Sequence, residues 1–351
     1  MVEKCMIFPA PPSTDEYGHP RSPNIIWDEL PEGMPGGGVR RPFLWLEAPE
    51  SLGTVIYFHA NAEDVGRAEA WLQMIHRNLG VNVLAVEYPG YGLLQTPEVL
   101  EDLDTASTII NMIDHAAVHA LQYAVLSKGV PSSRVLLYGR SIGSGPALRL
   151  AAYAREQLQW SLGGIVLQSP CLSTAQVACD LAGAVGSFLV PAYYDNLAAL
   201  RRLCAEPRET GAIQQWMPLL ILHGEQDDIV APYHGRTLLQ EAQRHGHPSA
   251  EAVFPPSATH DQWDVDSDVV LPIADFLVRR VFSFAGSAKP ACGAIQTAGE
   301  DPLRRLDKSL LVALQGALVA SEALAASEGP AREQEGCCES PAGARAPLAP
   351  L

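Results

Sequence analysis

Two patterns of hydrophobic and polar positions alternate along most of the chain. Short runs rich in Val, Ile, Leu and aromatic residues predict buried strands, and longer runs with helical spacing of apolar residues predict helices. The predicted strands are FLWLEA (43–48), TVIYFHA (54–60), NVLAVEY (82–88), RVLLYG (134–139), GIVLQS (164–169), PLLILHG (218–224) and EAVFPP (251–256). The predicted helices are 63–79, 97–128, 145–158, 233–245 and 266–283. Such alternation predicts an α/β fold with a mostly parallel central sheet flanked by helices.

Three segments depart from this alternation. Residues 1–40 hold several prolines and end in PEGMPGGGVRR, which predicts an irregular lead-in before a main domain at 41–284. Residues 170–217 are too long for a plain crossover, and their small and apolar side chains predict a cap over a pocket. Residues 285–351 are rich in Ala, Gly, Pro, Ser and Glu, which predicts a largely disordered tail. One helix is expected there, at 302–327, either docked on its own domain or frayed, or serving as a membrane-surface or partner helix.

Composition and charge narrow the classes of protein that this pattern allows. The chain has 351 residues, of which 47% are hydrophobic, and it lacks the stretch of about 20 apolar residues that a membrane span needs. A formal net charge of −16 argues against nucleic-acid binding and against attraction to anionic lipid, because both need clustered Lys and Arg. The start resembles no signal peptide, and the seven cysteines have no paired spacing. We therefore expect a soluble cytoplasmic protein with reduced thiols.

The most informative short motif is Gly139-Arg140-Ser141-Ile142-Gly143. It directly follows a predicted strand and opens a segment that is predicted to be helical. A serine at such a strand-to-helix turn is held out at the end of the sheet, beside the positive end of the helix. The flanking glycines let the strand and helix backbones approach closely. Ser141 is therefore a candidate nucleophile, with a structural turn serine as the alternative.

A nucleophilic serine needs a base that removes its proton and an acid that orients the base. Where the serine occupies such a turn, the acid and then the histidine follow it on loops at the ends of later strands. HGEQDDIV, at the end of one strand, offers Glu225, Asp227 and Asp228, and the last strand is followed by His260. The turn favours Asp227, with Asp228 as the open alternative. His260 is the candidate base, because the other histidines lie in helical patterns, in the lead-in or before loops with other roles.

Two backbone N–H groups would complete such a site by stabilising negative charge on a carbonyl oxygen. One belongs to Ile142, directly after the nucleophile. The other is expected from HANAEDVG, the loop after the second predicted strand, which makes Asn61 the candidate. The side chain of His59 is expected to anchor that loop. The glycines of EYPGYG (87–92) are expected to form a structural turn beside the site.

The motifs FHANAEDVG, EYPGYG, YGRSIGSGPA, HGEQDDIV and ATHDQWD together resemble the α/β-hydrolase superfamily. More narrowly, the chain is similar to the eukaryotic α/β-hydrolase-domain family that includes protein depalmitoylases, often catalogued beside serine aminopeptidase-like hydrolases. The likeness covers residues 41–284 and takes in CMIFPAP near the start and YYDNLAAL (193–200) in the predicted cap. One departure is Ala60, which stands where family members usually carry Gly.

The resemblance implies the α/β-hydrolase fold and a serine hydrolase that cleaves acyl thioesters or esters through an acyl-serine intermediate. Matched residue by residue, Ser141 is the nucleophile, Asp227 the acid and His260 the base, and the N–H groups of Asn61 and Ile142 form the oxyanion hole. No metal or organic cofactor is implied. The implied substrate is an acylated protein, such as one carrying a palmitoyl-cysteine, or a small acyl ester. A peptidase or small-ester esterase of the same fold and a non-enzymatic scaffold are the alternatives.

The same resemblance bears on localisation. Members of the family carry several cysteines near the N-terminus that are themselves acylated, and this chain has Cys5 there. Lipidation of Cys5 would give peripheral contact with the cytosolic face of a membrane. Because one acyl chain gives only marginal binding, stable anchoring would need a second signal. The sequence does not predict an oligomeric state.

Overall fold

The computed structural model describes Phe8, Ala10 and residues 22–29, 38–103, 105–205 and 216–281. The chain divides into two compact units, Met1–Phe276 and Leu277–Leu351. Of the second unit the structure describes one turn of π-helix, Leu277–Val281. Three predictions fall outside the described residues: the tail at 285–351, the helix at 302–327 and the environment of Cys5.

Within the described residues, the first unit is built on an eight-stranded sheet with the spatial order β1-β2-β4-β3-β5-β6-β7-β8. The strands are β1 (Ile25–Glu29), β2 (Arg40–Leu46), β3 (Thr54–Phe58), β4 (Asn82–Val86), β5 (Val135–Arg140), β6 (Gly164–Gln168), β7 (Leu219–Leu222) and β8 (Ala250–Val253). The pairs β1–β2 and β2–β4 are antiparallel, and the other pairs are parallel. The prediction of a mostly parallel sheet is confirmed.

Burial explains why the central strands have apolar sequences. Every residue of β3, β4, β6 and β7 is buried, because helices cover both faces of the sheet. The register places Phe58 beside Gly139 and Arg140 beside Gln168, so the carboxyl ends of β3, β5 and β6 meet at one edge. Loops that leave this edge can therefore bring residues far apart in the sequence into one site.

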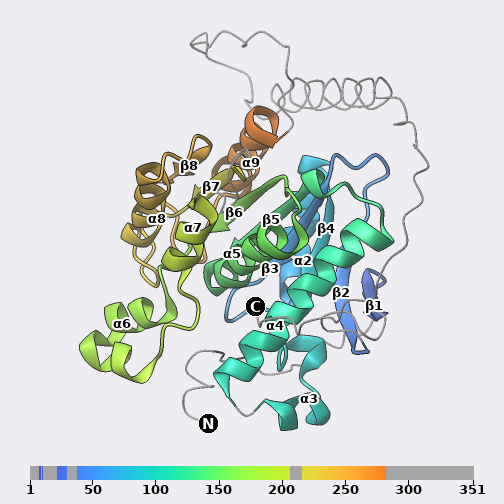
Figure 1. The fold of residues 1–351 in the computed structure, drawn as a ribbon, viewed down its shortest axis with the longest axis horizontal. Helices are drawn as coiled ribbons and strands as arrows, with labels where there is room; N and C mark the ends of the chain where they lie inside the picture. The colour runs from blue at the N-terminus through green and yellow to red at the C-terminus, as the bar shows by residue number, and fades with distance from the viewer. Residues whose placement is uncertain are drawn as a thin grey trace, which may run out of the picture. The chain divides into compact units, whose positions relative to one another are not determined.

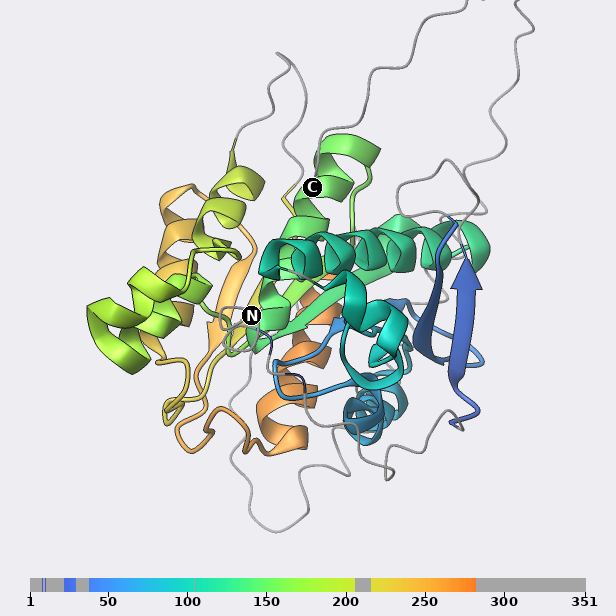
Figure 2. The same ribbon diagram turned by 90° about the horizontal axis from the view of Figure 1, so that it is seen from below.

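Most of the described helices form two layers, one on each face of the sheet. The helices are α2 (Val65–Leu79), α3 (Pro97–Asp102), α4 (Ala106–Gln122), α5 (Ser144–Tyr153), α6 (Thr174–Leu189), α7 (Asn196–Cys204), α8 (Tyr233–Arg244) and α9 (Leu271–Phe276). One layer contains α4, α5, α7 and α8, and the other contains α2 and α9 (Figures 1 and 2). The core lies between the sheet and these layers.

The prediction of an irregular lead-in at 1–40 is wrong at Ile25–Glu29, which forms β1. This strand pairs with β2, and Ile25 lies opposite Leu44. Its residues are half-buried or exposed, as befits the edge of the sheet. The segment therefore lacks the long apolar run by which the buried strands were predicted.

The single helix predicted at 97–128 is also wrong, because the chain forms two helices there. The second, α4, begins at Ala106, where the Thr105 hydroxyl accepts a hydrogen bond from the N–H of Thr108 at 3.1 Å. Such a side-chain cap satisfies an N–H that has no acceptor within the helix, and so it starts a new helix. The helical spacing of apolar residues continues across this boundary, so the sequence pattern does not show where one helix ends and the next begins.

The cap predicted at 170–217 is too wide, because α7 contacts α5 and α8 and belongs to their layer. Helix α6 stands away from the sheet (Figure 1). It bends at Gly183, whose φ of 65° and ψ of −159° are not helical. Beyond the bend the chain packs back on the first half, since a Cβ on Gly186 would lie 1.9 Å from the carbonyl oxygen of Ala178.

Candidate active site

Ser141 lies at the turn that joins β5 to α5, in a backbone conformation that non-glycine residues rarely adopt. Its φ is 54°, in the left-handed region. Close packing holds this turn: a Cβ on Gly139 would lie 2.4 Å from the Gly143 carbonyl oxygen, and one on Gly143 would lie 2.2 Å from that of Phe58. The two glycines of the motif are therefore required by space, as the sequence predicted. Strain that a fold maintains so tightly is typical of functional sites.

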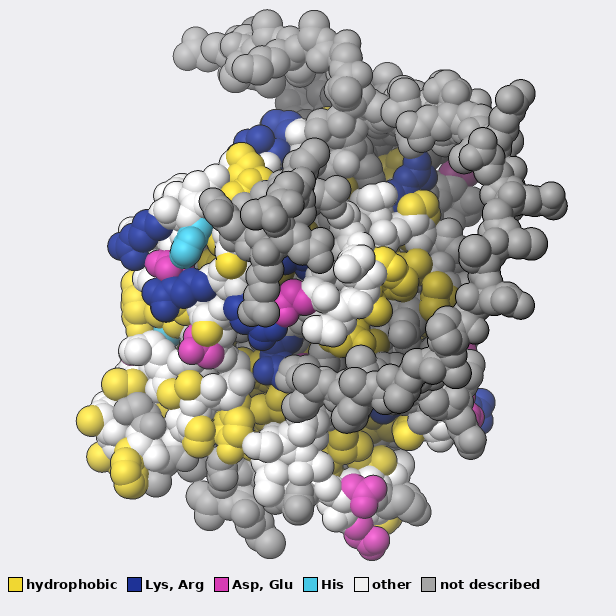
Figure 3. Space-filling model, viewed as in Figure 1, with side chains coloured by type: hydrophobic (Ala, Val, Ile, Leu, Met, Phe, Trp, Pro, Cys, Tyr) yellow, Lys and Arg dark blue, Asp and Glu magenta, His cyan; other side chains and the backbone are white. Residues whose placement is uncertain are grey.

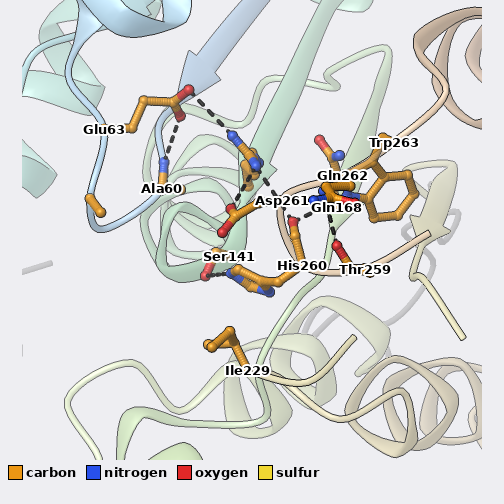
Figure 4. A network of polar contacts seen from close by, with 12 residues as sticks. Ala60, Glu63, Ser141, Gln168, Ile229, Thr259, His260, Asp261, Gln262 and Trp263 are labelled. Carbon is orange, nitrogen blue, oxygen red and sulfur yellow. Dashed lines mark hydrogen bonds and ion pairs between the residues drawn. The ribbon is translucent and has the colours of Figure 1, made fainter. Parts of the chain in front are cut away.

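His260 lies against Ser141, although 119 residues separate them in the sequence. Its Nε2 is 3.1 Å from the Ser141 Oγ, and its Nδ1 is 2.9 and 3.0 Å from the two carboxylate oxygens of Asp227 (Figure 4 shows the serine contact). An ionised carboxylate only accepts hydrogen bonds, so Nδ1 carries the proton that is donated to Asp227. Nε2 then has a lone pair that can accept the serine proton. All three side chains are buried.

The structure distinguishes between the candidate acids. Asp227 is buried, and its Oδ1 also accepts the N–H groups of Ile229 at 3.1 Å and Val230 at 2.8 Å. Asp228 is exposed to solvent. Glu225 forms an ion pair with Arg236. Of the three acids, Asp227 is therefore the one that contacts His260.

The electrostatics of Asp227 keep it ionised. Burial raises the pKa of its carboxyl, but hydrogen bonds from His223 and His260 and from the Val230 N–H outweigh burial and hold the pKa well below its usual range. His223 was not predicted to take part. Its Nε2–H donates to the Val230 carbonyl at 2.7 Å and lies 3.5 Å from the Asp227 Oδ2. The sequence signal was its place at the end of a buried strand, two residues before the acidic cluster.

The two predicted N–H donors, on Asn61 and Ile142, follow the neighbouring strands β3 and β5. Ile142 is the second residue of the 3-10 turn Ser141–Gly143, where an N–H has no acceptor within the turn. Among the described residues, no backbone acceptor faces the N–H of Asn61. The N–H before it, on Ala60, donates to the Glu63 carboxylate at 3.1 Å. Asn61 and Ile142 thus leave their N–H groups available on loops that begin at adjacent strand ends.

The loop that carries Asn61 is held by aromatic and histidine side chains. His59 is buried, donates from Nδ1 to the Ala60 carbonyl at 2.9 Å and stacks on Tyr88, with ring centroids 3.6 Å apart. The Tyr88 hydroxyl donates to the His59 carbonyl at 3.1 Å, and the Tyr91 hydroxyl donates to the Asn61 Oδ1 at 2.9 Å. The predicted anchoring by His59 and the structural turn at 87–92 are both confirmed.

Comparisons with known proteins agree with this architecture. The chain is 16% identical to a hyperthermophilic esterase from Pyrobaculum calidifontis, with a TM-score of 0.50 over 73% of this chain and 86% of that one. It is 18% identical to a Pyrococcus furiosus esterase, again with a TM-score of 0.50, over 78% of this chain and 98% of that one. The chain has the α/β-hydrolase fold. The fold predicted from the resemblance is confirmed.

Relatives at the level of sequence are α/β-hydrolase domain-containing proteins. The chain is 26% identical over 229 residues to the Caenorhabditis elegans protein aho-3, covering 65% of this chain and 58% of that protein. It is 23% identical over 198 residues to human α/β-hydrolase domain-containing protein 17B, covering 56% and 58%. No family model matches the chain. The matched part spans less than two thirds of the length of these relatives.

The chemistry available at this site follows from its side chains. Within the part of the chain that the structure describes, no group of three or more His, Cys, Asp or Glu side chains could hold a metal ion. The site offers a hydroxyl, an imidazole with a free lone pair, a buried carboxylate and two N–H donors. These groups together can carry out nucleophilic acyl transfer.

Proposed function

We propose that this protein is a serine hydrolase that cleaves acyl thioesters or esters through an acyl-serine intermediate. The observation that carries the proposal is the hydrogen-bonded order Asp227, His260, Ser141, with the serine at a left-handed turn. A serine that served only to make the turn would need neither a histidine nor a buried carboxylate behind it. The presence of all three side chains also argues against a non-enzymatic scaffold.

Each group has a defined task in this mechanism. As the Ser141 Oγ attacks the acyl carbonyl carbon, its proton passes to the His260 Nε2, and Asp227 stabilises the imidazolium that forms. The negative charge moves to the carbonyl oxygen, where the N–H groups of Asn61 and Ile142 would bind it. Collapse of this intermediate expels the thiol or alcohol, which takes the proton from Nε2. Water then attacks the acyl-serine with His260 again acting as base, and the free acid leaves.

Helix α6 favours an acyl substrate over a peptide with a free amino terminus. Asp180 is the one acidic residue of the helix, and it accepts hydrogen bonds from the Tyr233 hydroxyl at 2.6 Å and from the His234 Nε2 at 2.8 Å. It is therefore engaged and leaves no unpaired carboxylate on α6 for an ammonium group. Ile229, two residues after Asp227, is 43% exposed and lies near Ser141 and His260 (Figure 4). An apolar side chain at this point suits a hydrocarbon chain.

A substrate panel tests this choice. We expect kcat/KM for a palmitoyl thioester or ester to exceed that for the acetyl compound with the same leaving group, because each buried methylene adds about 0.8 kcal/mol of binding. An aminoacyl amide should not be turned over. Preferred cleavage of the short ester or of the amide would favour the small-ester esterase or the peptidase instead.

We further propose that α6 contacts a lipid bilayer and acts as a second signal beside acylation of Cys5. Leu181, Val185 and Phe188 expose 61%, 67% and 88% of their surfaces, and hydrophobic side chains gather over this part of the protein (Figure 3). Among the described residues, no helix is both long and apolar enough to cross a membrane. An exposed apolar helix whose single charged residue, Asp180, is already hydrogen-bonded suits a zwitterionic lipid surface on a protein of net charge −16.

Vesicle binding checks this contact. Unacylated protein should float with phosphatidylcholine vesicles, and the double change Leu181→Asp, Val185→Asp should reduce the partition coefficient about 10-fold or more, because it removes apolar area and adds charge. Leu126→Asp, which alters a leucine that is 58% exposed outside α6, is the matched control and should leave binding unchanged. Equal flotation of the double variant and the wild type would contradict the contact.

A further inference from the structure

Arg140 makes contacts that the triad does not account for. It precedes the nucleophile, yet its side chain is only 15% exposed. One nitrogen, Nη1, lies 3.3 Å from the Glu63 Oε1, and the other, Nη2, lies 3.1 Å from the Asp261 Oδ1. The same Nη2 is 3.5 Å from the His260 carbonyl oxygen. The guanidinium thus bridges two acids that are separated from it by 77 and 121 residues in the sequence.

Glu63 connects this guanidinium to the loop that carries the Asn61 N–H. Its Oε2 accepts the Ala60 N–H at 3.1 Å and the Tyr57 hydroxyl at 3.0 Å, while Oε1 faces Arg140 (Figure 4). The carboxylate therefore fixes the residue directly before Asn61. A shift of Glu63 would change where the Asn61 N–H points.

On the other side, the guanidinium reaches the loop that carries the base. Arg140 and the Trp263 Nε1–H, at 3.1 Å, both face the His260 carbonyl, and Asp261 follows His260 directly (Figure 4). These contacts hold the backbone of the base, whereas Asp227 contacts its ring. Burial lowers the pKa of Arg140, but the nearby Tyr57, Glu63, Tyr138 and Asp261 together raise it, so the cation persists.

We infer that Arg140 is a positioning residue that sets the place of the Asn61 N–H donor and of His260 relative to Ser141. The inference rests on the proposed function, because it assigns Arg140 a task in that reaction. Arginine suits this task since its planar fork presents donors in two directions at once, whereas lysine offers one compact ammonium. Misplacement of reacting groups by about 1 Å can cost around 100-fold in rate.

The test compares Arg140→Ala and Arg140→Lys with the wild type, using a p-nitrophenyl ester and a fluorophosphonate probe. We expect Arg140→Ala to lower kcat about 10-fold to 100-fold with KM changed less than about 3-fold. Arg140→Lys should recover part of the loss, and millimolar guanidinium should raise kcat of Arg140→Ala only. Arg202→Ala, which breaks the exposed ion pair with Glu156, is the matched control and should keep wild-type kcat.

A double-mutant cycle with Glu63→Gln separates positioning from general destabilisation. If the pair acts as one unit, the double variant should lose no more activity than Arg140→Ala alone, whereas independent effects would multiply. A kcat within 2-fold of wild type for Arg140→Ala, multiplying losses in the cycle, or the absence of guanidinium rescue in a folded variant would each overturn the inference. If Arg140→Ala does not fold, Arg140→Lys and Glu63→Gln are measured instead, and a kcat within 2-fold of wild type would again overturn the inference.

The controls keep this outcome apart from failure of the proposed function. A wild-type protein that neither hydrolyses the ester nor reacts with the probe refutes the hydrolase itself, and the role of Arg140 falls with it. A labelled, active wild type with an unaffected Arg140→Ala refutes only the positioning role.

Discussion

Replacing Ser141 by Ala is expected to abolish labelling by a fluorophosphonate probe and to lower kcat by roughly 10⁴-fold to 10⁶-fold. The hydroxyl is the group that would form the acyl bond, and its Oγ lies 3.1 Å from the His260 Nε2. The left-handed φ of 54° costs more for alanine than for glycine, but serine and alanine bear the same Cβ. The fold should therefore persist, which circular dichroism and the Tm would verify.

Ser133 provides the matched control for this experiment. It is exposed and lies in the 3-10 turn Ser132–Arg134 before β5, at the end of the strand opposite to Ser141. Ser133→Ala should retain both labelling and turnover. If Ser141→Ala still reacts with the probe while Ser133→Ala behaves as wild type, another residue is the nucleophile and the proposed mechanism is wrong.

Exchanging Asp227 for Asn is the second change with a large expected effect, a decrease in kcat of about 10⁴-fold. An asparagine amide can donate to the His260 Nδ1, which would place the ring proton on Nε2. His260 could then no longer accept the serine proton, although its distance of 2.9 Å from the side chain at 227 would hardly change. Ester turnover by each purified variant measures the effect.

Asp228, the residue next to Asp227, provides the control for this test. Asp228→Asn makes the identical chemical change one position later, on an exposed side chain, and should leave kcat within about 2-fold of wild type. An equal loss in both variants would mean that the charge of the acidic turn matters more than the Asp227–His260 hydrogen bond.

The sequence predicted the fold class, but it missed some element boundaries, such as β1 and the start of α4. Ser141 and His260 were proposed because each follows a predicted strand, buried in the case of β5 and half-buried in the case of β8, and parallel strands bring their carboxyl ends to one edge. The choice between Asp227 and Asp228 depends on the turn, in which the N–H groups of Ile229 and Val230 bind one carboxylate and leave the other in solvent. Residue types alone cannot distinguish adjacent aspartates.

The contacts that were missed depend on long-range geometry. Arg140 occupies the variable position of a five-residue motif, and nothing nearby in the sequence indicates its ion pairs with Glu63 and Asp261. The bend in α6 was hidden for a different reason. Gly183 lies in an apolar run that contains no proline to mark a break, and the close packing of Gly186 against Ala178 appears only when the chain folds back.

The packing around the motif glycines affects how substitutions near Ser141 should be interpreted. A Cβ at Gly139 would collide with the Gly143 carbonyl, within the turn itself. One at Gly143 would collide with the Phe58 carbonyl of β3, and one at Gly145 would collide with the ring of Tyr194, which precedes α7. Loss of activity in variants at these glycines will therefore reflect a displaced backbone, whatever reaction the protein catalyses. In a survey of random mutants, loss of activity indicates a chemical role only at side chains such as Ser141, whose replacement by a smaller side chain requires no movement of the surrounding backbone.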